Sequence, residues 1–130
     1  YVVVCDDLQS AGGPHEFQWL LHSDAEIAPE GQSGFALSQG GKTLHLRFAL
    51  PQSVVTRVED FQVDGKPAGK VLRATPAAPS ERARFVAVLS QDVCPDLQAT
   101  ESEGAVKVSL PGGAEVSFDA DTGEATAVAP

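Results

Sequence analysis

The sequence is short of basic residues. Its 130 residues contain 9 Lys and Arg against 18 Asp and Glu, which gives a formal net charge of −9. Nucleic-acid-binding proteins concentrate basic side chains to neutralise phosphates, whereas the densest basic spot here is Arg82 with Arg84. The charge balance therefore argues against DNA, RNA and anionic membranes as partners. It also argues against binding of an anionic polymer by this chain alone.

Long apolar runs and helical patterns are also missing. No apolar run approaches the roughly 20 residues of a membrane helix, and no basic segment followed by an apolar stretch indicates a signal peptide. The one stretch of good helix formers is too short to nucleate a stable helix. Because the sequence opens directly on the β-forming run YVVVCDD, we expect it to be a piece of a longer chain.

Cysteine is scarce, with only Cys5 and Cys94 present. Neither belongs to a CxxC pair, which excludes zinc-ribbon and thioredoxin-type sites. Both lie beside strand-like segments, so a disulfide between them would close a long loop, worth about 4–5 kcal/mol in the chain-entropy model. Two buried, unreactive thiols are an equally open alternative.

What the sequence does contain is apolar residues at every second position, the period of a half-buried strand. This alternation is clearest in KTLHLRFALP (42–51) and HEFQWLLH (15–22), while ARFVAVLS (83–90) is apolar on both faces and is typical of a central strand. The side chains expected on the apolar faces of the first two are Leu44, Leu46, Phe48 and Leu50, and then Phe17, Trp19 and Leu21.

Turn residues divide the rest of the chain into short strands. Gly112-Gly113 and Asp64-Gly65 predict hairpin connections. Residues 74–82 carry two prolines and predict a surface loop, and residues 119–130 predict a turn followed by a weak last strand. The pattern predicts an all-β fold, an antiparallel β-sandwich of roughly nine or ten short strands, formed by residues 1–130 as a single domain around a single core.

The residue pattern offers two candidate metal ligands, Asp6 and His22, because each lies near the end of a predicted strand. A hairpin of strands Tyr1–Cys5 and His15–Leu21, turning at Gly12-Gly13-Pro14, would place Asp6 nearer to His15 than to His22. Two ligands are also fewer than a closed site requires. A turn-capping aspartate and a partly exposed histidine are the alternative interpretation.

Other chemistry is weakly indicated. His45 stands beside Arg47 on the polar face of its strand and is interpreted as a surface or sheet-face histidine. Trp19 is in phase with the core positions, which disfavours an exposed aromatic platform for sugars. No Ser or Cys has a nucleophile motif and no glycine loop precedes a helix. We therefore assign no catalytic and no cofactor-binding residue.

The opening strands nevertheless resemble a known family. The order YVVVCDDL, Gly-Gly-Pro, HEFQWLLH, GFALSQGGKTLHLRFALP and RFVAVL is similar to the C-terminal β-domain of heparinase II/III-like polysaccharide lyases. The similarity covers about residues 1–90, and residues 91–130 match only as further weak strands.

This resemblance implies a non-catalytic C-terminal β-sandwich module of a bacterial enzyme that cleaves uronic-acid polysaccharides, such as glycosaminoglycans or alginate, by β-elimination. An upstream helical toroid of the same polypeptide would carry the catalytic groups and the anionic polysaccharide, in the periplasm or outside the cell. Some relatives hold a structural zinc or other divalent metal, and their pattern maps onto Asp6 and His22, with a further ligand outside this chain. An independent carbohydrate-binding module and a structural or adhesive β-domain are the alternatives.

Overall fold

A computed structural model describes residues 1–92, 97–102 and 104–130. Within these residues the chain forms twelve β-strands and one short 3-10 turn, η1 (Pro111–Gly113). The strands are β1 (Val2–Gln9), β2 (Trp19–Ser23), β3 (Glu26–Pro29), β4 (Gly34–Gln39), β5 (Lys42–Leu50), β6 (Val54–Val63), β7 (Lys66–Pro76), β8 (Arg82–Ser90), β9 (Gln98–Ser102), β10 (Ala105–Ser109), β11 (Glu115–Asp119) and β12 (Ala125–Val128). No helix in the described part is long and apolar enough to cross a membrane.

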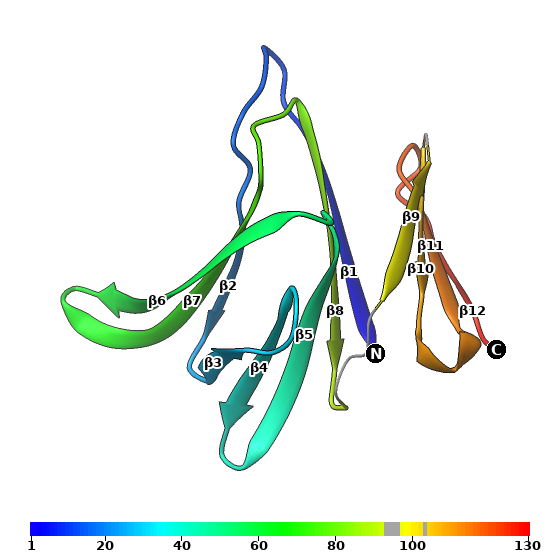
Figure 1. Cartoon of the computed structure of the whole chain (residues 1–130). Coiled ribbons are helices and arrows are strands. Elements are labelled where there is room, and N and C mark those ends of the chain that lie inside the picture. The colour runs from blue at the N-terminus through cyan, green and yellow to red at the C-terminus, as the bar shows by residue number, and fades with distance from the viewer. Residues whose placement is uncertain (93–96, 103) are drawn as a thin grey trace.

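All strand pairs of the described residues are antiparallel, and they make three sheets. The central sheet has the order β1-β8-β5-β4-β3, the ribbon sheet β2-β7-β6, and the C-terminal sheet β12-β11-β10-β9. Figure 1 shows the ribbon sheet on one side of the central sheet and the C-terminal sheet on the other. The predicted all-β antiparallel fold is confirmed, with more strands than expected and a third sheet.

Two separate apolar clusters hold the three sheets together, where the sequence predicted a single core. The first joins the central and ribbon sheets, and the second joins the central and C-terminal sheets. The first cluster contains Phe35, Leu46, Phe48, Leu72 and Phe85 with smaller neighbours. The second contains Leu50, Val86, Val88, Val106 and Val108, with Phe118 packed against it.

Strand β8 belongs to both clusters, as its two apolar faces predicted. Phe85 and Ala87 face the first cluster, whereas Val86 and Val88 face the second, and all four side chains are fully buried. Because successive side chains of a strand point to opposite faces, one strand can supply both cores. β8 pairs with β1 on one side and β5 on the other, so it is the centre of the molecule.

The alternation predicted for β5 holds only in the middle of the strand. Leu46 and Phe48 lie in the first cluster as expected, but Leu50 lies in the second, and Leu44, near the start of the strand, is exposed. The register between β5 and β8 shifts between Phe48 and Leu50. An extra residue in one strand of a pair reverses the faces of the residues that follow it, so this bulge transfers Leu50 to the other core.

The double burial of β8 predicts an unequal response to truncation of two apolar side chains. Phe85→Ala removes a fully buried ring and should lower the free energy of unfolding by about 3–5 kcal/mol. Val128→Ala, on an exposed edge strand, should change it by less than about 0.5 kcal/mol. Urea denaturation followed by far-ultraviolet circular dichroism measures both. Equal losses in the two variants would contradict the assigned core.

Candidate functional site

Asp6 lies in the space between the central and ribbon sheets. Its Oδ2 atom accepts a hydrogen bond of 3.0 Å from the indole Nε1 of Trp19. The Trp19 ring in turn packs edge-on against Phe48, with ring centroids 5.2 Å apart. Trp19 is therefore held against the first cluster by its ring and by its N–H, which confirms its predicted core position.

His22 lies on the opposite face of β2. It comes three positions after Trp19, and an odd spacing on a strand reverses the face; its side chain is exposed, and its ring packs edge-on against Phe61 at 4.6 Å. The ribbon sheet therefore separates His22 from Asp6. In this arrangement the two side chains do not fit a common metal ion, and no group of three or more His, Cys, Asp or Glu in the described residues is placed to hold one.

The hairpin assumed between the first two predicted strands is wrong. β1 pairs with β8, with Asp6 opposite Phe85, and β2 pairs with β7 in another sheet. His15 instead makes an isolated bridge with Ser80, through backbone bonds of 2.9 and 3.0 Å. Gly12 and Gly13 both have positive φ, but the connection that contains them crosses between sheets, which short-range turn signals do not reveal.

An ionic cluster connects the central and C-terminal sheets. Asp7 accepts hydrogen bonds of 2.9 and 2.6 Å from Arg82 and one of 3.3 Å from Arg84. Arg84 also donates to Glu101 of β9 at 3.2 Å, and its side chain is only 6% exposed. The hydrogen bond from Arg82 holds the pKa of Asp7 below its usual range. The densest basic spot of the sequence is thus neutralised by carboxylates of the same chain.

Cys5 lies beside this cluster, half-buried on the same face of β1 as Asp7. Burial raises the pKa of its thiol, and the positive charge of Arg84 opposes the rise. A raised pKa leaves little thiolate, the reactive form, at neutral pH. Cys5 is a free cysteine in this structure, and its candidate partner, Cys94, lies outside the described residues. The disulfide and the alternative of two unreactive thiols therefore both stay predictions.

His45 has a partner that the sequence did not reveal. It lies on the sheet face as predicted, but its ring is buried rather than on the surface: the residue is 9% exposed and its Nδ1 atom is 2.7 Å from Glu30 Oε2. Glu30 begins the loop before β4, fifteen positions earlier, so no local pattern connects the two. The pair holds this loop against β5. A carboxylate that orients an imidazole is a feature of general bases, but a ring this enclosed offers little access to a substrate.

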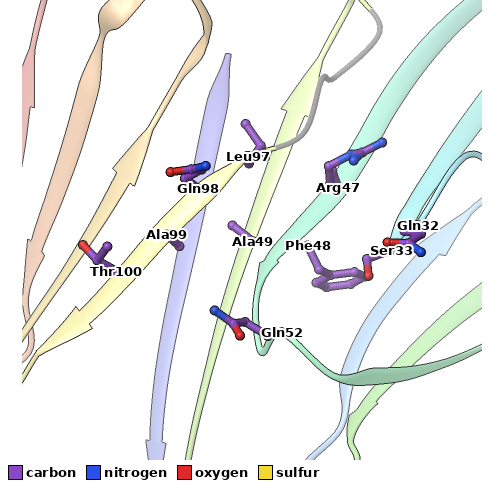
Figure 2. Close-up of a pocket in the computed structure, with 10 residues that line it drawn as sticks. All are labelled: Gln32, Ser33, Arg47, Phe48, Ala49, Gln52, Leu97, Gln98, Ala99 and Thr100. Atoms are coloured by element: carbon purple, nitrogen blue, oxygen red, sulfur yellow. The ribbon is translucent and has the colours of Figure 1, made fainter.

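A polar groove of about 410 Å³ lies between β5 and β9. Figure 2 shows residues of β9 on one side and Arg47, Gln32 and Ser33 on the other. The lining combines three carboxamides, two hydroxyls, one guanidinium and four apolar side chains: Gln32, Gln52, Gln98, Ser33, Thr100, Arg47, Phe48, Ala49, Leu97 and Ala99. Carboxamides and hydroxyls both donate and accept hydrogen bonds, so the groove suits an uncharged polar ligand.

One wall of this groove is a tight loop. Glu30 N–H donates to Gly34 O at 2.8 Å, and Phe48 N–H donates to Ser33 O at 2.9 Å. Ser33 has a φ of 57°, and a Cβ on Gly34 would stand 2.3 Å from the Glu30 carbonyl oxygen. A non-glycine residue in the left-handed region is uncommon and is sustained by its surroundings. The loop is therefore fixed in one conformation, and only glycine fits at position 34.

Comparison of the chain with protein-family models, with curated proteins and with solved structures gave no significant match.

The separation of Asp6 from His22 predicts different effects on Trp19. Asp6→Ala removes the acceptor of the indole N–H and leaves a partly buried donor without this acceptor. The change should cost about 1 kcal/mol of stability and shift the Trp19 emission maximum. His22→Ala, on the other face of β2, should leave the emission unchanged. Fluorescence spectra of both variants provide the measurement; equal spectral changes would mean that the two residues share one site.

The ionic cluster predicts a particular dependence of stability on pH. The folded-state pKa of Asp7 is lowered, so its contribution is fully present above the ordinary value of 3.8 and is lost as the pH falls through the lowered value. The stability of Asp7→Asn should therefore fall less steeply below about pH 4 than that of the unmodified chain. Glu81→Gln, an exposed carboxyl at the start of the same region, is the control and should leave the slope unchanged. Urea titrations across this pH range would contradict the assignment if Asp7→Asn and the control behaved alike.

Proposed function

We propose that this chain is a non-catalytic β-module of a larger polysaccharide lyase of the heparinase II/III-like type. In this proposal an upstream toroid of the same polypeptide cleaves a uronic-acid polysaccharide by β-elimination, and the module supports and orients it. The supporting observation is that most of the pattern that carries the resemblance coincides with strands: YVVVCDDL with β1, GFALSQ and KTLHLRFAL with the β4–β5 hairpin, and RFVAVL with β8. Of HEFQWLLH, only the last four residues belong to a strand, because β2 begins at Trp19.

The ion pairs and hydrogen bonds of the ionisable groups also support a non-catalytic role. Asp7 and Glu101 are bound to arginines, Glu30 is bound to the enclosed His45, and the Asp6 carboxylate accepts from Trp19. β-Elimination needs a base that reaches the proton beside the substrate carboxyl group. Carboxylates and a histidine that are already paired within the fold are poorly suited to act as this base. The periplasmic or secreted location of the parent belongs to the same proposal.

The independent carbohydrate-binding alternative has less support. Such modules present aromatic rings to stack on sugars, and the single tryptophan here is packed against Phe48 and hydrogen-bonded to Asp6. The structural zinc or other divalent ion implied by the resemblance also has less support, because Asp6 and His22 lie on opposite sides of the ribbon sheet. We keep both as outcomes of experiment.

The test is a β-elimination assay on three proteins: the full-length parent, this chain alone, and the parent lacking this region. Heparan sulfate, chondroitin, hyaluronan and alginate serve as substrates, and the ultraviolet absorbance of the unsaturated uronate product reports turnover. We expect turnover by the parent, none by this chain, and reduced turnover or reduced thermal stability of the shortened parent.

Two results would overturn the proposal. Turnover by the isolated chain would show that it carries catalytic groups of its own. A parent that folds but cleaves none of the four polymers would favour the structural or adhesive role. Trp19 fluorescence is recorded in the same samples, and quenching of the isolated chain by any of the polymers would favour the independent binding module.

A further inference from the structure

The polar groove follows the edge of a strand rather than its face. Its lining includes four consecutive residues, Leu97 to Thr100, of which the last three belong to β9. Successive side chains of a strand point to opposite faces, so a pocket over one face would contact every second residue only. Contact with consecutive residues therefore places the groove along the strand edge.

That edge lacks a strand partner in the described structure. β9 is the last strand of the C-terminal sheet and pairs with β10 on its other side, from Gln98 opposite Ser109 to Ser102 opposite Ala105. In an antiparallel edge strand, half of the backbone N–H and C=O groups point away from the sheet. The groove thus offers backbone donors and acceptors at the regular spacing of a β-ladder.

The opposite wall is also built from hydrogen-bonding groups. β4 begins at Gly34, which pairs with Arg47, so the last residues of β5 extend beyond β4. There the tight loop before β4, which carries Gln32 and Ser33, lies beside β5 and accepts a hydrogen bond from Phe48 N–H. Gln52 closes the groove beyond the bulge of β5. These carboxamides can each pair with a peptide group, since they present one donor group and one acceptor group.

The charges of the groove and of the whole chain indicate which peptides the groove would accept. Its lining contains no carboxylate and one cation, Arg47, which already has an interaction within the fold, while the whole chain carries −9. An acidic partner would be repelled by the surrounding charge. Leu97 and Ala99 face the second cluster, whereas Gln98 and Thr100 face solvent. A strand added here would therefore present apolar and polar side chains alternately.

We propose that this groove binds an extended, uncharged or basic segment of another polypeptide, which adds to the C-terminal sheet as a strand beside β9. Main-chain hydrogen bonds to the β9 edge supply the affinity, and alternation of apolar and polar side chains supplies the selectivity. This inference goes beyond the lyase-module proposal and does not depend on it, because it rests on the strand edge and the groove alone.

The test is a titration of the isotope-labelled 130-residue chain, followed by nuclear magnetic resonance. The probe is a capped seven-residue peptide of alternating Val and Thr with Lys at both ends. We expect saturable shifts of the Gln98, Ala99 and Thr100 backbone amides and of the Gln32 and Gln52 side-chain amides. Exchange of the outward-pointing β9 amides with solvent should slow by about tenfold or more at saturation.

The matched control is the same peptide with alternate backbone nitrogens methylated, which removes its donors but keeps its side chains. It should not bind. The exposed edge strand β12 is the internal control, and its amides should not respond. Equal binding of the methylated peptide, equal responses at β12, or no saturable shift at β9 would each overturn the proposal. Cellohexaose is titrated in parallel, and a groove response to this neutral sugar without a response to the peptide would also overturn it.

Discussion

The structure depends on one strand being buried on both faces. β8 supplies Phe85 and Ala87 to the core under the ribbon sheet and Val86 and Val88 to the core under the C-terminal sheet. Its backbone groups are paired on both sides, by β1 and β5. A segment without water on any side must satisfy every backbone group internally, and a central antiparallel strand does so. The two outer sheets are then placed by the side chains that this strand directs toward each.

The sequence predicted those parts of the fold that local pattern controls. Alternation identified β5 and the continuous apolar run identified β8 as central, while Asp64-Gly65 and the glycines at 112 and 113 marked real connections. Partner choice was not predictable in the same way. β1 pairs with β8 across most of the chain, and the third sheet arises because a second apolar face of β8 needed covering. Such pairings depend on the summed burial of distant strands.

The candidate site shows the same limit. The core position of Trp19 followed from its phase with Phe17 and Leu21, but its bond to Asp6 joins different sheets. His45 was correctly assigned to a sheet face, yet its enclosure comes from Glu30, in a loop shaped by Ser33 and Gly34. The groove could not be foreseen at all, because it lies between a bulged strand and the edge of another sheet. A bulge changes faces without an evident sequence signal.

Some paired strands are neighbours in the sequence and others are far apart, and this difference affects the order in which the sheets fold. The C-terminal sheet is a meander in which β9, β10, β11 and β12 pair in sequence order, so each pairing closes only a short loop. The pairing of β1 with β8 instead brings together the two ends of a long intervening segment. Loop closure costs more entropy as the loop lengthens, and contacts between distant segments slow folding. We therefore expect the meander to form early, as a series of local hairpins. The central sheet, on which the meander packs, is complete only after β1 has paired with β8.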